Sequence, residues 1–148
     1  MIRKFLECYK EFDLASDKIT ALEGNLLVEP AEPATLDSDE YRDFDLITVG
    51  AALHHFPSAE ESLRLLGKRL KAGGVLFISD LHDERNKGED DPRRPGPKGY
   101  KKEEFVGLAT KAGLVDVRFE ILAEMLEIEL LDEQVVKIEC FVATARRP

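Results

Sequence analysis

The segment FDLITVGAAL, residues 44–53, constrains the fold of this chain more than any other stretch. It is an apolar run of the kind that forms a parallel strand covered on both faces. Ser58 and Glu61 follow with the spacing of a capping box, so a helix is expected to begin there. Gly73–Gly74 is expected to end that helix, and residues 75–79, VLFIS, are typical of a second buried strand. The segment therefore predicts a strand–helix–strand unit, with Leu63, Leu66 and Leu70 on the inner face of the helix.

Weaker patterns assign the rest of the chain. Apolar residues spaced by three and four predict an amphipathic helix near residues 1–12, and a short strand is expected at 19–22. Residues 82–99 are rich in proline, glycine and charge, which favours a long loop. Periodicity and turn residues predict a helix over 100–113, a strand over 115–121, and two antiparallel strands joined near 132–134.

Composition limits the class of protein. The chain has 148 residues, which fits one domain spanning residues 1–148. Its net charge of −9 and its isoelectric point of about 4.9 argue against nucleic acid or an anionic membrane as a partner. No apolar run approaches the ~18 residues that span a bilayer. We therefore expect a soluble, cytoplasmic protein in which Cys8 and Cys140 are free thiols rather than a disulfide.

Four segments, in this order, resemble a class I S-adenosylmethionine-dependent methyltransferase domain. KITALEGNLL (18–27) is similar to its third strand, and FDLITVGAALHHF (44–56) is similar to its fourth. SLRLLGKRLKAGGVLFISD (62–80) resembles the next helix, glycine turn and fifth strand, and FVGLATKAGLVDVRFE (105–120) resembles the last helix and sixth strand. The resemblance covers nearly all of the chain. It implies an α/β fold, an incomplete Rossmann-like methyltransferase sheet of about five strands with a C-terminal antiparallel hairpin.

The N-terminal part of that family has no counterpart in this chain. It comprises a first strand, a glycine-rich turn that approaches the cofactor, and an acidic residue that binds the ribose. No G-x-G lies upstream of residue 18. Because the first strand would pair with residues 44–50, its absence would leave that strand with a free apolar edge. We expect the strand at 19–22 to move over to this edge, or a homodimer partner or a complementing chain to cover it.

The resemblance implies four cofactor-binding positions for S-adenosylmethionine. Asn25 occupies the position that contacts the adenine, and Gly50 and Ala51 flank the methionine moiety. Leu53 would then lie near the adenine side. Structural interpretations compete with these roles. Asn25 follows Gly24 and could serve as a turn residue, and Gly50 could serve close packing of strand against helix.

The pair His54–His55 has three interpretations. As catalytic residues they could accept a proton from a substrate hydroxyl or nitrogen, since imidazole titrates near neutral pH. As metal ligands they could join His82, Asp80 and Asp83, although adjacent strand residues point to opposite faces, and we expect no bound metal. As structural residues they could bond a backbone group at the strand end. Asp80 and Asp83 are expected to be solvated residues that begin the following loop.

Two functions of different classes follow. The first is a methyltransferase acting on a small molecule, whose cofactor site is completed by a partner chain or by an upstream segment. Its catalysis would consist mainly of aligning the acceptor with the sulfonium methyl group. The alternative is a catalytically inactive methyltransferase-like remnant that acts through protein contacts or dimerisation. A metal-dependent hydrolase that uses the histidines is a third and less favoured hypothesis.

Overall fold

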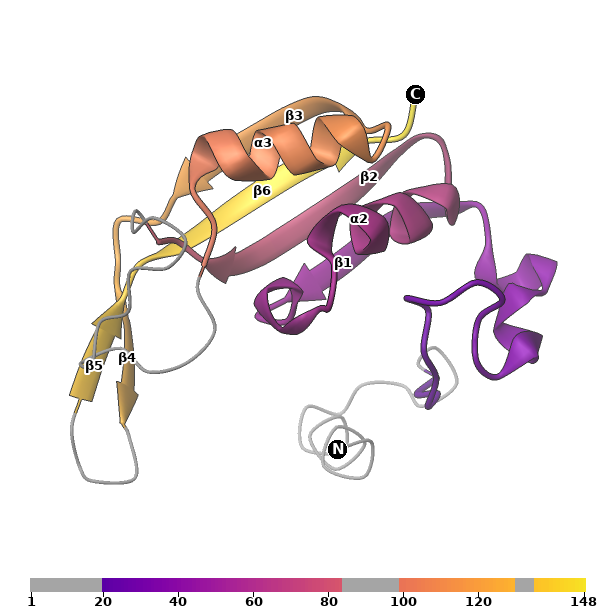
Figure 1. Ribbon diagram of the computed structural model, residues 1–148, viewed down its shortest axis with the longest axis horizontal. Helices are drawn as coiled ribbons and strands as arrows, with labels where there is room; N and C mark the ends of the chain where they lie inside the picture. Colours follow the sequence, from indigo (N-terminus) through magenta and orange to yellow (C-terminus); the bar gives the residue numbers. More distant parts are fainter. Residues whose placement is uncertain (1–19, 84–98, 130–134) are drawn as a thin grey trace.

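The computed structural model describes residues 20–83, 99–129 and 135–148. Within them lies a four-stranded sheet with the order β1-β2-β6-β3 (Figure 1). Its strands are β1 (Phe44–Gly50), β2 (Leu70–Leu81), β6 (Cys140–Arg146) and β3 (Val115–Ile121). β1 runs parallel to β2, whereas β6 runs antiparallel to both β2 and β3. The predicted α/β sheet is confirmed, with four strands. The helix expected near residues 1–12 and the thiol of Cys8 lie outside the described residues.

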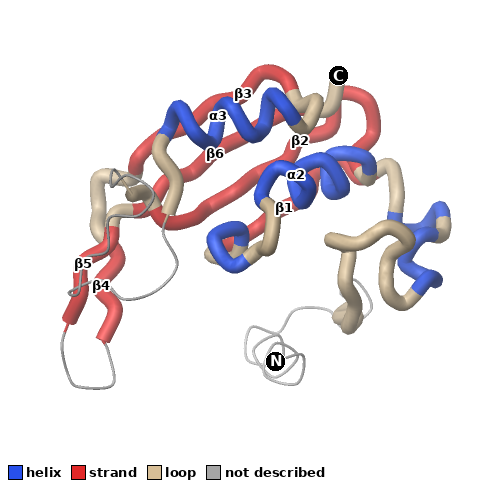
Figure 2. The backbone as a smooth tube through the Cα atoms, in the orientation of Figure 1, coloured by secondary structure: helices blue, strands red, loops and turns tan. Residues whose placement is uncertain are grey.

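Two helices, α2 (Ala59–Lys68) and α3 (Lys102–Lys111), lie side by side over one face of the sheet (Figures 1 and 2). α2 begins where the capping box predicts, because Ser58 Oγ accepts a hydrogen bond from the backbone N–H of Glu61 at 3.3 Å. The strand–helix–strand unit expected from the sequence is therefore present. Among the helices of the described residues, none is long and apolar enough to cross a membrane.

The glycine pair does not end α2, which is a difference from the prediction. The helix stops at Lys68, and β2 already begins at Leu70, before Gly73 and Gly74. Gly74 instead permits the close approach of β1, since a Cβ atom there would lie 2.8 Å from the carbonyl oxygen of Phe44. Gly74 therefore serves the packing of two strands rather than the end of a helix.

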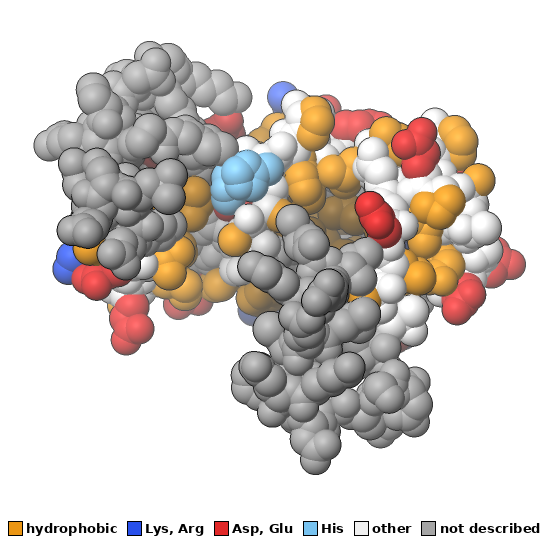
Figure 3. Space-filling view, turned by 90° about the horizontal axis from the view of Figure 1, so that it is seen from below, with side chains coloured by type: hydrophobic (Ala, Val, Ile, Leu, Met, Phe, Trp, Pro, Cys, Tyr) orange, Lys and Arg blue, Asp and Glu red, His pale blue; other side chains and the backbone are white. Residues whose placement is uncertain are grey.

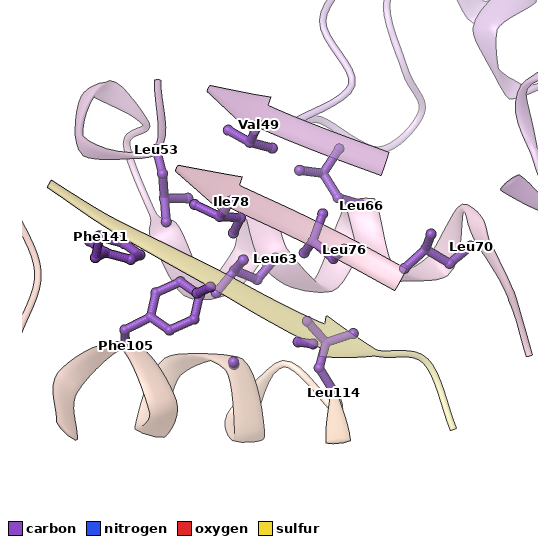
Figure 4. Close-up of a cluster of buried hydrophobic side chains, with 13 residues drawn as sticks. Val49, Leu53, Leu63, Leu66, Leu70, Leu76, Ile78, Phe105, Leu114 and Phe141 are labelled. Carbon is purple, nitrogen blue, oxygen red and sulfur yellow. The ribbon is translucent and has the colours of Figure 1, made fainter. Parts of the chain in front are cut away.

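The hydrophobic core lies between the two helices and the sheet (Figure 4). Phe141 of β6 stacks on Phe119 of β3 with ring centroids 4.2 Å apart, and Phe105 of α3 contacts both rings. Burying a side chain of this kind stabilises a fold by roughly 1.5–3 kcal/mol. Of the leucines predicted to form the inner face of α2, Leu63 and Leu66 are buried on the helix, whereas Leu70 is buried as the first residue of β2. The largest fully buried side chains are Phe105, Phe141, Leu53, Leu63, Leu70, Leu76 and Ile78.

A separate hairpin stands at one end of the sheet (Figure 2). Its strands, β4 (Leu126–Glu129) and β5 (Val135–Ile138), pair antiparallel, as the sequence predicts. The residues that join them lie outside the described part. A two-stranded hairpin is marginally stable alone. Its attachment is short, because β5 leads through a single residue into β6 of the main sheet.

Arg69 fixes the segment that precedes β1. This segment contains the short helices η1 (Ala34–Asp37) and η2 (Asp39–Tyr41). The Arg69 side chain is 9% exposed, and it donates to the carbonyl oxygens of Leu36 at 2.6 Å and Tyr41 at 3.1 Å and to Asp37 Oδ1 at 2.7 Å. A hydrogen bond from the Ala31 N–H and the nearby guanidinium groups hold the pKa of Asp37 below its ordinary value.

The outer edge of β1 has no neighbouring strand in the described part of the chain. The strand expected at 19–22 is absent over residues 20–22. Asn25 instead pairs with Glu32, exchanging backbone hydrogen bonds of 2.6 and 3.0 Å, so this segment folds back on its own turn. Leu46 of β1 is 54% exposed. On the face seen from below in Figure 3, hydrophobic side chains gather in the middle.

Candidate functional site

The carboxyl ends of β1 and β2 lie side by side, which is where parallel α/β sheets place their sites. Gly50 ends β1, and the backbone N–H of Ala51 still donates to Ser79 O of β2 at 2.8 Å. Ala51 has φ +47°, a left-handed conformation that is strained for alanine and recurs at functional sites. The chain then turns into the short helix η3 (Leu53–His55), which carries both histidines.

Asp80 organises this strand end. Its side chain is fully buried, and its carboxylate accepts two backbone hydrogen bonds and contacts one histidine ring nitrogen. Oδ1 bonds His54 Nδ1 and accepts from Leu81 N at 2.7 Å, while Oδ2 accepts from the backbone N–H of His54 at 3.2 Å. The expectation that Asp80 is solvated is wrong. Asp80 lies two residues after Ile78 on the strand and therefore points to the same, core-facing side of the sheet.

The two histidines differ in their surroundings. The His54 side chain is 7% exposed, whereas His55 is exposed on the surface. Their ring centroids are 4.0 Å apart, and the rings are tilted by 44°. Histidine side chains form a pale-blue patch on the face seen in Figure 3. His54 is therefore oriented by a buried acid, and His55 contacts solvent beside it.

Tyr100 and Cys140 lie close enough to the Asp80 carboxylate to interact with its charge. Tyr100 Oη donates to Leu53 O at 3.1 Å, which ties the segment before α3 to η3. Burial, followed by the charges of Asp80 and Glu104, raises the pKa of Tyr100 to about 12. Burial and the charge of Asp80 also raise the pKa of Cys140, a free and half-buried thiol. Both groups are therefore neutral near pH 7.

The four residues expected to bind the cofactor differ in how far they are exposed. Gly50 and Ala51 are exposed at the end of β1. Among the described residues, a Cβ atom on Gly50 would meet only Ser79 Oγ, at 3.8 Å, so close packing within that part of the chain does not require the glycine. Leu53 is fully buried in the core, and its side chain offers no surface to a ligand in this structure. Asn25 is exposed, and its Oδ1 accepts from Leu27 N at 2.9 Å, a turn-forming bond.

Two further ionisable side chains at the end of β2 are also buried. His82 and Asp83, at the end of β2, are 2% and 5% exposed, so the expectation that Asp83 is solvated is wrong. His82 Nδ1 lies 3.4 Å from Glu139 Oε2. Within the described residues, no group of three histidine, cysteine or acidic side chains is placed to hold a metal ion. The sequence signal that was missed is that of Asp80, an acid placed in phase with the buried residues of its strand.

Several solved structures share this fold. The YcgJ protein of Bacillus subtilis matches with a TM-score of 0.65 and 14% identity, over 100% of this chain and 79% of its own. The cyclase SpnF matches with a TM-score of 0.59 and 16% identity, over 99% of this chain and 62% of its own. A candidate methyltransferase of Bacillus halodurans matches with a TM-score of 0.52 and 18% identity, over 73% of this chain and 65% of its own.

These likenesses, together with the strand order, show that the chain has a class I methyltransferase fold. The chain spans less than two thirds of the length of SpnF and of the Bacillus halodurans protein. No protein-family model matches the sequence, and no curated protein matches it. One of the similar structures is a cyclase, so the reaction has to be argued from the site rather than from the fold.

Proposed function

We propose that this chain forms the acceptor side of an S-adenosylmethionine-dependent methyl transfer site for a small molecule, in the cytoplasm. One observation carries the proposal. At the carboxyl ends of two parallel strands, the exposed backbone of Gly50 and Ala51 lies next to a histidine that a buried carboxylate holds in place. Catalysis would consist mainly of alignment, because a sulfonium methyl group needs an acceptor placed in line with it.

The cofactor fits this strand end in part. Gly50 lacks a side chain although its own surroundings leave room for one, which supports close approach of a ligand to the backbone. Gly50 and Ala51 would line the methionine portion, and Leu53 would support that wall from the core. Asn25 would reach an adenine only with its amide N–H groups, since its oxygen is bonded within its own turn. When bound, the cofactor supplies the electrophilic methyl group.

A further strand along the free edge of β1 would complete the site. Because alternate residues of a strand bond to opposite neighbours, the bond from Ala51 N to β2 implies that Thr48 N–H and Gly50 N–H face away from β2. β1 carries only one charged residue, Asp45, and exposes Leu46, whereas natural edge strands are usually protected by charges or proline. The strand would come from a complementing chain, from a second copy, or from an upstream segment of a longer polypeptide.

Titration calorimetry with S-adenosylmethionine and with S-adenosylhomocysteine tests the cofactor. Heat of binding with a micromolar dissociation constant is the expected result for a completed site. Gly50→Val is the matched variant, since its side chain would fill the space above the strand end and should abolish the heat. A flat titration of a folded, strand-completed complex would contradict the proposal.

A second function, docking through protein contacts without a cofactor, is favoured by the same free edge. Leu46 and Phe44 are 54% and 37% exposed, and Val75, Phe77 and Val142 alternate with core residues and so face away from the two helices. An apolar sheet face of this kind suits a protein partner. A flat calorimetric titration together with a stable dimer in light scattering would support this function over methyl transfer.

A further inference from the structure

The contact between Asp80 and His54 joins two segments 26 residues apart. All three donors that reach the Asp80 carboxylate are N–H groups or a ring nitrogen. An ionised carboxylate only accepts hydrogen bonds, and it suits three such donors. His54 Nδ1 therefore carries a hydrogen and donates it to Asp80. In the neutral ring this leaves Nε2 unprotonated, with a lone pair available.

The lone pair has a defined direction, because His54 is held at two points. Its backbone N–H and its ring nitrogen bond the two oxygens of one carboxylate, so the backbone and the ring are fixed by the same group. Among the described residues, no hydrogen bond reaches His54 Nε2, and the His54 side chain is 7% exposed. The nitrogen opposite the bonded one is therefore not occupied by a partner from the described part of the chain.

We propose that Asp80 is a positioning residue that fixes His54 as a proton acceptor at Nε2, and that the methyl acceptor is a hydroxyl or protonated amine. This inference rests on the proposed function. The acceptor atom attacks the sulfonium methyl group, and a new bond to that carbon forms as the sulfur–methyl bond breaks. The bonding electrons stay on sulfur, which leaves as a neutral thioether. A hydroxyl passes its proton to Nε2 of His54 as it attacks. A protonated amine passes its proton to Nε2 before it attacks, because an ammonium nitrogen has no lone pair. Charge and atoms balance in both cases.

Few other charged groups face this pair. His55 contacts the His54 ring, and Tyr100 and Cys140 lie within the electrostatic reach of Asp80. Tyr100 and Cys140 stay neutral near pH 7 because their pKa values are raised, and Glu104 acts on Tyr100. Neither neutral group can replace the carboxylate as the partner of Nδ1–H. The tautomer of His54 is therefore set by Asp80.

Nitrogen-15 NMR of the histidine rings tests the inference without a cofactor. In the wild-type chain at neutral to mildly alkaline pH, His54 should show a protonated Nδ1 and a bare Nε2. A bare Nδ1, or a hydrogen on Nε2 of the neutral ring, overturns the inference.

Asp80→Asn supplies the comparison, because an amide can donate to Nδ1 and thereby favours the opposite tautomer. Asp45→Asn, the same exchange at an exposed position of β1, should leave the His54 signals unchanged. If Asp80→Asn does not fold, the wild-type spectrum alone decides. An unchanged tautomer in folded Asp80→Asn contradicts the role given to Asp80.

Turnover provides the second readout, with S-adenosylmethionine as donor and a simple phenol or primary amine as probe acceptor. Asp80→Asn should lower the rate at neutral pH by ~10²-fold or more, the usual contribution of a general base. Part of that loss should be recovered at higher pH, where the acceptor loses its proton unaided. Absence of wild-type turnover in a strand-completed complex would contradict the proposed function, while the NMR result would still decide the role of Asp80.

Discussion

Thr48→Pro tests whether the free edge of β1 is a strand-pairing surface. Ala51 N donates to Ser79 O, so the alternation along β1 turns the N–H of Val49 toward β2 and the N–H of Thr48 outward. Thr48 is exposed. Proline at this position removes an outward donor and places its ring in the path of an added strand, while the hydrogen bonds between β1 and β2 stay intact.

The magnitude follows from the bond that is lost. One hydrogen bond contributes a net ~0.5–1.5 kcal/mol, and the clash of the proline ring with the added strand acts in the same direction. Since ~1.4 kcal/mol corresponds to a tenfold change, the dissociation constant of a strand-completed dimer or complex should rise by ~10-fold or more. The free energy of unfolding of the isolated chain should change by less than ~1 kcal/mol, because edge strands tolerate proline.

Sedimentation over a concentration series measures this association. Thr48→Ala is the matched control, since it shortens the side chain in the same way but keeps the backbone N–H. Val49→Pro is the contrasting variant and should unfold the chain, because it removes a donor directed at β2 and a buried side chain. Equal association of the Thr48→Pro and Thr48→Ala variants would refute the assignment of this edge.

Four further substitutions test other contacts. Arg69→Met should lower the free energy of unfolding in urea by ~2–4 kcal/mol, because it leaves two carbonyl oxygens and a carboxylate without their buried donor. Arg64→Met, at a more exposed ion pair, should lower the free energy of unfolding far less than Arg69→Met. Ser58→Ala should cost ~1 kcal/mol in thermal melts through loss of the α2 cap. Asp37 has a folded pKa below its ordinary 3.8, so the stability it contributes is present above that value and is lost as pH falls through the folded pKa. Asp37→Asn should flatten this dependence near and below the ordinary value of 3.8 in urea titrations.

The parts of the fold that could be predicted are those encoded by local pattern. The apolar run at 44–50, the Ser58 cap and the alternation over 115–121 depend on neighbours in sequence, and each marks the element found there. The helix end predicted at Gly73 and Gly74 was wrong, because a glycine pair can mark either a helix end or a close contact between strands. Local pattern cannot separate these two, since the contacting strand lies far away in the sequence.

The site was predictable only in position. The expectation of a site at the end of residues 44–50 follows from the parallel strands and the histidine pair. The partner of His54 did not follow, because an aspartate at a strand end is usually solvated and its contact spans 26 residues. The short strand at 19–22 failed for a related reason. Its pattern was brief, and Asn25 bonds its own turn at Glu32 instead of a neighbouring strand.

The burial of Asp80 also restricts how this chain can diverge. Replacing His54 while Asp80 is kept would leave a buried carboxylate without its ring partner, a change that costs several kcal/mol. Losing Asp80 first leaves a ring that can stay uncharged. An apolar residue at position 54 beside the retained acid should therefore destabilise the fold more than a neutral residue at position 80 beside the retained imidazole.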